Sequence, residues 1–140
     1  MFKQEYLCFA LDSEEYAVEL NSIKGVVHSS KITRVPNVDP FVKGVINLRG
    51  LMVPVVDLRE KLGLTPKEYS KIAVIILIEG SGRIMGIIVD AIPDMVEISP
   101  EELQPPFYSQ NLRGKEYIKI LGRKESRLII ILDPDKIIPL

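Results

Sequence analysis

The sequence has little of what most metal sites and disulfide frameworks are made from. Its 140 residues contain one histidine, one cysteine and no tryptophan. The single cysteine, Cys8, excludes an intrachain disulfide and a thiolate metal cluster. A metal site would have to be built mostly from carboxylates, and His28 is better explained as a structural or solvent-facing side chain. We therefore expect no metal and no cofactor.

The motifs of common enzyme classes are also missing. No glycine-rich phosphate loop precedes a helix, because Gly80-Ser81-Gly82 lies inside a predicted hairpin. No nucleophile elbow occurs, and only one histidine could serve as a base. Adjacent acids such as Glu14-Glu15 and Glu101-Glu102 are explained by solvated turns and helix starts. We predict a binding module rather than an enzyme.

Charge and hydropathy exclude two further classes of partner. The formal net charge is −1 and no block of basic residues occurs, so a nucleic acid or an anionic membrane has no electrostatic handle. No apolar run approaches the roughly 18 residues of a membrane span, and the first residues do not resemble a signal peptide. We expect a soluble cytoplasmic protein, which only a partner would hold near a membrane.

The pattern of apolar residues indicates an all-β chain. Runs rich in β-formers are separated by polar turns at close spacing, which predicts eight to ten short strands with minor helices, as in sandwiches or small barrels. The runs are residues 6–11, 16–20, 26–27, 44–57, 72–78, 84–89, 92–98, 117–122 and 128–132. Residues 72–78 are apolar without alternation, which is typical of a strand buried on both faces. We expect two subdomains that share the hairpin of residues 72–89.

Short helices are predicted from apolar spacing at one place and from a capping residue before a proline at two others. Residues 58–64 have apolar side chains four apart and a glycine near the end. Ser99 and Asp133 each precede a proline, which fits the first position of a helical turn.

Residues 44–57 are the most informative stretch. Two apolar runs flank a polar break, and Gly50 can supply a positive φ, so we predict strand, turn and strand with Arg49 at the tip. Pro54 cannot donate to a ladder, which predicts a sheet edge or a bulge there. The guanidinium of Arg49 needs water or a carboxylate. Either it caps local carbonyls or pairs with Asp57 or Asp90, or it contacts a partner.

The same stretch carries a family likeness. Gly44-Val45-Ile46-Asn47-Leu48-Arg49-Gly50, followed by Pro54-Val55-Val56-Asp57-Leu58, strongly resembles the CheW-like family of bacterial chemotaxis coupling proteins. Residues 6–20, 32–36 and 86–90 extend the likeness, so that it covers essentially the whole chain.

The resemblance implies one CheW-like domain over residues 1–140, made of two interleaved, SH3-like five-stranded β-barrels that pack together. It implies a non-catalytic adaptor that joins the cytoplasmic tip of a methyl-accepting chemoreceptor to the regulatory domain of a CheA-type histidine kinase, recruited to membrane receptor arrays. The positions matching the receptor-binding set are Gly44, Arg49, Val74 and Met95. The positions matching the kinase-binding set are Leu7, Leu20 and Ile23.

Two alternatives stay open at this point. The chain could be the coupling protein of a related chemosensory or motility pathway, which sequence alone does not separate from the first reading. It could also be a small β-barrel ligand-binding protein, which would need a closed pocket with convergent polar groups.

Overall fold

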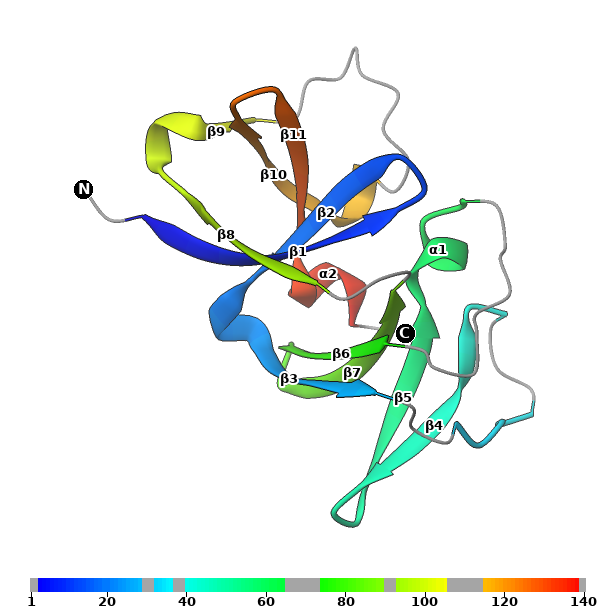
Figure 1. The fold of residues 1–140 in the computed structure, drawn as a ribbon. Helices are drawn as coiled ribbons and strands as arrows, with labels where there is room; N and C mark the ends of the chain where they lie inside the picture. Colours follow the sequence, from blue (N-terminus) through cyan, green and yellow to red (C-terminus); the bar gives the residue numbers. More distant parts are fainter. Residues whose placement is uncertain are drawn as a thin grey trace.

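The protein consists of two curved β-sheets packed face to face with a few short helices (Figure 1). The computed structural model describes residues 3–28, 32–36, 40–64, 74–89, 93–105 and 115–138. The six-stranded sheet has the order β8-β1-β2-β11-β10-β9, and the five-stranded sheet has the order β3-β6-β7-β5-β4.

The elements have the following bounds. The six-stranded sheet contains β1 (Gln4–Leu11), β2 (Glu14–Glu19), β8 (Asp94–Ile98), β9 (Leu103–Gln104), β10 (Ile118–Lys124) and β11 (Arg127–Leu132). The five-stranded sheet contains β3 (Ile23–His28), β4 (Val42–Leu48), β5 (Leu51–Asp57), β6 (Val74–Gly80) and β7 (Arg83–Val89). The helices are α1 (Leu58–Lys61) and α2 (Pro134–Ile137), with single turns η1 (Leu20–Ser22), η2 (Pro100–Glu102) and η3 (Lys115–Tyr117).

The chain visits the six-stranded sheet twice. It forms β1 and β2 there, crosses through η1 to build the whole five-stranded sheet, and then returns at β8. Each sheet is completed by one parallel pair of strands distant in sequence, β2 with β11 and β5 with β7. The two sheets are therefore interleaved along the chain.

Strand alternation divides the apolar side chains into three layers. One layer is formed by buried side chains of the six-stranded sheet alone and includes Tyr6 and Cys8. A second is formed by buried side chains of the five-stranded sheet and includes Ile75 and Leu77. The third, which we call the shared cluster, lies between the sheets and combines side chains of both, such as Leu7 and Phe9 with Val74, Ile76, Ile78 and Ile87. The two sheets are thus held together by a common core.

The predicted all-β fold of two packed units is confirmed. The six-stranded sheet exceeds the expected five strands because of β9, which has only two residues. The apolar run forms β6 from Val74 onward, buried on both faces between β3 and β7, while residues 72 and 73 lie outside the described residues. The hairpin β6–β7 belongs to the five-stranded sheet alone. The prediction that both units share this hairpin was wrong, because its two strands hydrogen-bond only within the five-stranded sheet.

Pro54 shows how β5 changes partners along its length. The strand lies inside the sheet, but its ladder with β7 begins only at Val55, so at Pro54 it is paired with β4 alone. The predicted edge is therefore local to this residue. The irregularity in register lies instead in β4, between Val42 and Gly44.

The predicted helix starts are confirmed. The Asp57 carboxylate accepts hydrogen bonds from two backbone amides of α1, and the Asp133 carboxylate accepts one from the amide of Asp135 in α2. In η2, the backbone amide and hydroxyl of Ser99 donate to the Glu102 carboxylate at 2.9 and 2.8 Å. In the described part of the chain, no helix has the length and apolar character needed to cross a membrane.

Candidate functional site

The tip of the hairpin β4–β5 is a two-residue turn. The last paired residues are Leu48 and Leu51, and between them Arg49 and Gly50 have φ values of 50° and 86°. Positive φ at both central positions is the signature of a type I′ turn. The backbone amide of Gly50 donates a 2.9 Å hydrogen bond to the Asn47 side chain. The predicted turn is confirmed. Of its two central residues, Gly50 adopts a positive φ without strain, whereas Arg49 carries a Cβ and is strained there.

Arg49 is exposed and lies at the other end of β5 from one of the carboxylates expected to pair with it. Asp57 lies at the opposite end of β5, is 1% exposed and caps α1. The prediction that Asp57 could pair with Arg49 was wrong, because the full length of the strand separates them. Asp90 lies outside the described residues. None of the ion pairs found among the described residues involves Arg49.

Exposed apolar side chains accompany Arg49. Leu51 and Met52 are 53% and 55% exposed, and with Arg49 they form what we call the tip surface. Leu51 and Met52 also line an open groove of about 390 Å³, together with Ile84 and Met85 at the start of β7. Its lining is mostly apolar, which differs from the convergent polar pocket that the ligand-binding alternative requires.

Gly44 has a packing role beneath this hairpin. The backbone of Thr33 forms two 2.8 Å hydrogen bonds with Val45, which brings residues 32–33 across β4. A Cβ added at Gly44 would stand 2.7 Å from the Thr33 carbonyl carbon and 2.9 Å from the Ile32 side chain. The φ of 148° is also unfavourable for other residues. Gly44 is buried, so its contribution to binding would come through the shape of the hairpin.

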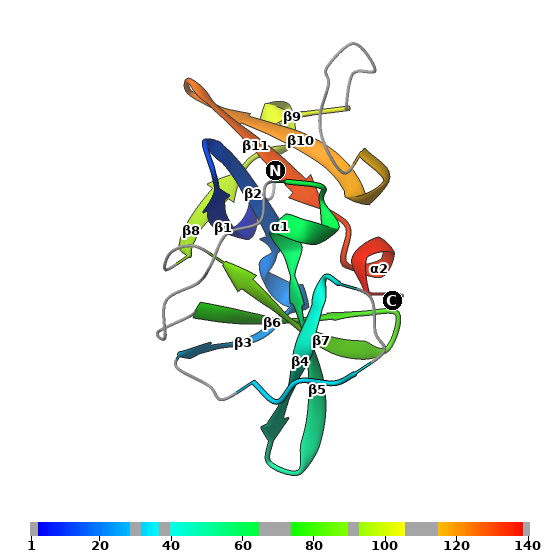
Figure 2. The ribbon, with the colours of Figure 1, turned by 90° about the vertical axis from the view of Figure 1, so that its right-hand side faces the viewer.

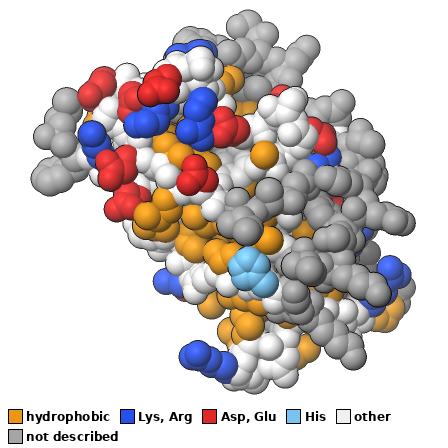
Figure 3. All heavy atoms as spheres, in the orientation of Figure 1, with side chains coloured by type: hydrophobic (Ala, Val, Ile, Leu, Met, Phe, Trp, Pro, Cys, Tyr) orange, Lys and Arg blue, Asp and Glu red, His pale blue; other side chains and the backbone are white. Residues whose placement is uncertain are grey.

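A second exposed apolar area lies where the two sheets meet. Met95 on β8 is 54% exposed and stands directly opposite Leu7 on β1, so their side chains share one face of the sheet. Across the interface, Val26 on β3 is 39% exposed and stands opposite Ile76. We call Met95 and Val26, with the buried Leu7 and Val74 beneath them, the seam surface. Figure 3 shows hydrophobic side chains gathered on this face beside the histidine.

The structure brings together residues of both binding sets that the family resemblance implies. Leu7 and Val74 belong to the shared cluster, and Ile23 packs against it, so members of both sets meet at the seam. Leu20 lies in η1, at the crossing between the sheets. Arg49 is apart from them, because the hairpin tip projects away from the six-stranded sheet in both views (Figures 1 and 2). The partner that each residue contacts stays a prediction.

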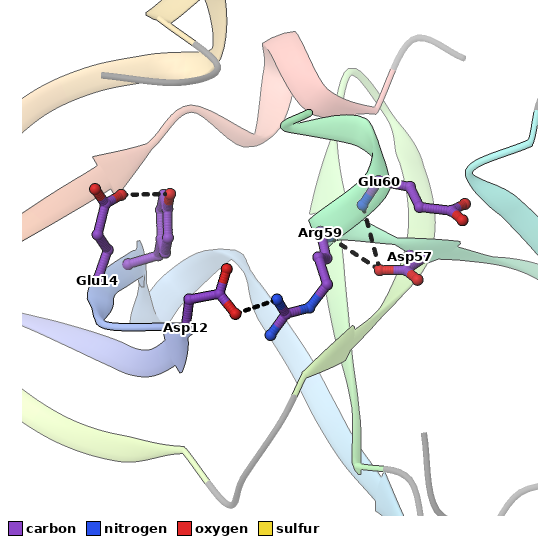
Figure 4. Close-up of polar contacts among 6 residues, drawn as sticks. Asp12, Glu14, Asp57, Arg59 and Glu60 are labelled. Carbon is purple, nitrogen blue, oxygen red and sulfur yellow. Dashed lines mark hydrogen bonds and ion pairs between the residues drawn. The ribbon is translucent and has the colours of Figure 1, made fainter. Parts of the chain in front are cut away.

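Sequence reasoning missed Arg59, whose side chain is 2% exposed. Its guanidinium forms an ion pair with Asp12, in the turn between β1 and β2 (Figure 4). A guanidinium carries a permanent charge, so its burial requires acceptors. The sequence holds no signal for this pair, because the residues are 47 positions apart and a charged residue in a short helix is ordinarily exposed.

Charged contacts also join strands distant in sequence. Arg127 on β11 donates to both carboxylate oxygens of Glu15 on β2, at 2.6 and 3.0 Å, and these hydrogen bonds lower the pKa of Glu15. Burial raises the pKa of the Cys8 thiol to about 12, so the thiol stays protonated. Within the described ranges no group of three histidine, cysteine or acidic side chains is placed to hold a metal.

Comparisons with known proteins by family, by sequence and by structure agree with one another. The model of the CheW-like domain matches residues 5–140. The chemotaxis protein CheW of Klebsiella aerogenes is 34% identical over 136 residues, which is 96% of this chain and 81% of that protein. The CheW of Thermotoga maritima is 37% identical, covering 96% of this chain and 87% of that protein. The crystal structure of the scaffolding protein TtCheW from Thermoanaerobacter tengcongensis superposes with a TM-score of 0.91 at 27% identity, covering 99% of this chain and 94% of that one.

Proposed function

The chain belongs to the CheW-like family and is a non-catalytic chemotaxis scaffold, and from this premise we propose that it joins a chemoreceptor tip to a CheA-type histidine kinase through two separate surfaces. The observation that supports this proposal is that its two exposed apolar areas lie in different parts of the fold. The seam surface lies where the sheets meet, and the tip surface lies at the end of the hairpin β4–β5.

The seam surface suits the helical tip of a receptor. An amphipathic helix binds by laying its apolar face into an apolar groove. Met95 and Val26 stand on opposite sides of the interface, one on each sheet, so a helix between them would contact both. The flexible thioether of Met95 can adapt to different side chains of a partner. Leu7 and Val74 form the buried support of this surface.

The tip surface suits the regulatory domain of the kinase. Leu51 and Met52 give it the apolar centre that protein interfaces use, and Arg49 gives it a fixed cation. A carboxylate of the partner could accept two parallel hydrogen bonds from the guanidinium, which would fix the orientation of the complex. The family likeness alone placed Arg49 with the receptor; the projection of the hairpin away from the seam favours a separate partner.

The mechanism follows from holding both partners at once. Since the shared cluster fixes one sheet on the other, a partner at the seam and a partner at the tip keep a constant relative geometry. A shift of the receptor then reaches the kinase through contacts, without any chemical step in the adaptor.

Calorimetric titration with each isolated partner tests the proposal. We expect Met95→Asp to weaken binding of the receptor tip by at least tenfold and to leave binding of the kinase regulatory domain unchanged. Arg49→Asn should do the reverse, and Arg123→Asn, an exposed change on β10, should affect neither. If Met95→Asp and Arg49→Asn weaken the same partner equally, the assignment of two surfaces is wrong.

A further inference from the structure

The helix α1 touches the six-stranded sheet although it follows β5 of the five-stranded sheet directly. With four residues it is too short to be stable alone. The Asp57 carboxylate holds its first amides at 3.0 and 3.4 Å, and Leu58 and Leu62 anchor it in the shared cluster. Its polar side chains are therefore held in fixed directions.

Arg59 makes the first contact across the interface. Its guanidinium reaches Asp12, the first residue of the turn that joins β1 to β2 (Figure 4). Asp12 is 51% exposed while Arg59 is 2% exposed, so water reaches the carboxylate and the buried cation approaches it from the side of the core. An ion pair with one buried partner has a more restricted geometry than a surface pair.

Lys61 makes the second contact across the interface. Its ammonium group lies 4.4 Å from the centre of the Phe41 ring and 5.4 Å from the centre of the Tyr117 ring. Phe41 precedes β4 of the five-stranded sheet, whereas Tyr117 ends η3 and leads into β10 of the six-stranded sheet. A cation over two rings is attracted to both, so Lys61 joins the two sheets.

The residue between them makes a contact of a different kind. Glu60 forms a 2.8 Å ion pair with Lys43 on β4, within the five-stranded side. Three consecutive residues of one helical turn thus provide two contacts that bridge the sheets and one that does not. A substitution at Lys43 therefore serves as a control, because it removes a contact of α1 that does not join the two sheets.

We propose that Arg59 and Lys61 are positioning residues that set the angle between the two sheets, and thereby the width of the seam surface. The helix lies on the right of the interface in Figure 1, while β3 and β8, which carry Val26 and Met95, lie on the left. The crossing at η1 and the 2.8 Å hydrogen bond from the Ser81 amide to Asp135 in α2 hold other parts of the interface. Loosening α1 therefore changes the orientation of the sheets without separating them.

Spin-label distance measurements on the full chain test this inference without any partner. Labels are attached to cysteines introduced at Lys24 on β3 and Glu97 on β8, both exposed, while the native Cys8 is 3% exposed and does not take the label. Asp12→Asn removes the charge and keeps a residue that tolerates the φ of 58° at this turn. Lys61→Met removes the second cation and keeps its apolar stem. Lys43→Gln is the matched control.

We expect Asp12→Asn with Lys61→Met to shift and broaden the distance distribution, and Lys43→Gln to leave it unchanged. Near-ultraviolet circular dichroism confirms that each variant is folded. An unchanged distribution in the double variant would overturn the inference, and so would an equal broadening in Lys43→Gln. Given the proposed function, the double variant should also bind the receptor tip several-fold more weakly and the kinase domain normally. The distance measurement tests the positioning role independently of any binding partner.

Discussion

At the scale of single residues, Arg49 combines an exposed guanidinium with a backbone conformation that few residues adopt readily. Its φ of 50° lies in the left-handed region, where glycine and asparagine are the residues with the least strain. The protein keeps an arginine there, beside two exposed apolar side chains. Selection for the turn alone would favour asparagine, so a role for the side chain in binding is the better explanation.

Two substitutions at Arg49 separate the turn from the side chain. Arg49→Asn should change the free energy of unfolding by less than about 0.5 kcal/mol, because asparagine tolerates the turn. Arg49→Val should lower it by about 1–2 kcal/mol, because a β-branched residue resists positive φ. Chemical denaturation measures both values. A large loss of stability in Arg49→Asn would show that the guanidinium has a structural role instead.

Glu15 gives the molecule part of its acid sensitivity. Its folded pKa is lowered by the hydrogen bonds from Arg127, so its contribution to stability is present above the unfolded pKa of about 4.3 and is lost as the pH falls through the folded pKa. Both side chains are partly exposed, which limits the contribution to below about 1 kcal/mol at neutral pH.

Glu15→Gln tests this contribution. The variant should melt at a lower temperature than the native protein at pH 7, and the difference should shrink as the pH falls below about 4. Melting curves over this pH range provide the measurement. A difference that stays constant with pH would show that the ion pair does not contribute through the charge of Glu15.

At the scale of elements, the hairpin β4–β5 depends on a close approach of backbone at Gly44. Gly44→Ala would place a methyl group against the backbone of residues 32–33, and we expect a loss of about 1–3 kcal/mol in the free energy of unfolding. Denaturant titration measures it. Gly50→Ala is the matched comparison, since a Cβ there meets nothing within 4 Å and only its φ of 86° is strained. Equal losses in both variants would show that backbone strain alone, without packing, explains the glycine at 44.

The elements were predictable from the sequence wherever a local signal exists. The hairpin turns, the capping residues Ser99 and Asp133, and the buried run of β6 depend on neighbours within a few positions. The parallel pairs β2–β11 and β5–β7 and the ion pair of Asp12 with Arg59 have no local signal, because they join segments far apart in the chain. The pairing of Leu7 on β1 with Met95 on β8 has no local signal either, because these strands are also far apart in the chain.

At the scale of the whole molecule, the shared cluster decides whether the sheets behave as one unit. Its side chains come from strands of both sheets and from both α-helices. That residues 1–140 form a single domain stays a prediction, and it implies one cooperative unfolding transition in which calorimetric and van't Hoff enthalpies agree. Ile76→Ala, in this cluster, should lower hydrogen-exchange protection in β7 and β11 alike, by about 2–5 kcal/mol. Protection lost in β7 alone would indicate two independent units.

Two separate surfaces would allow the chain to bind both partners at the same time. The most direct measurement is sedimentation of the chain mixed with the kinase regulatory domain, followed by titration of that complex with the receptor tip. We expect a complex of all three proteins, with the affinity for the receptor tip unchanged by the bound kinase domain. Displacement of one partner by the other would contradict it, because it would mean that the tip surface and the seam surface are not separate sites.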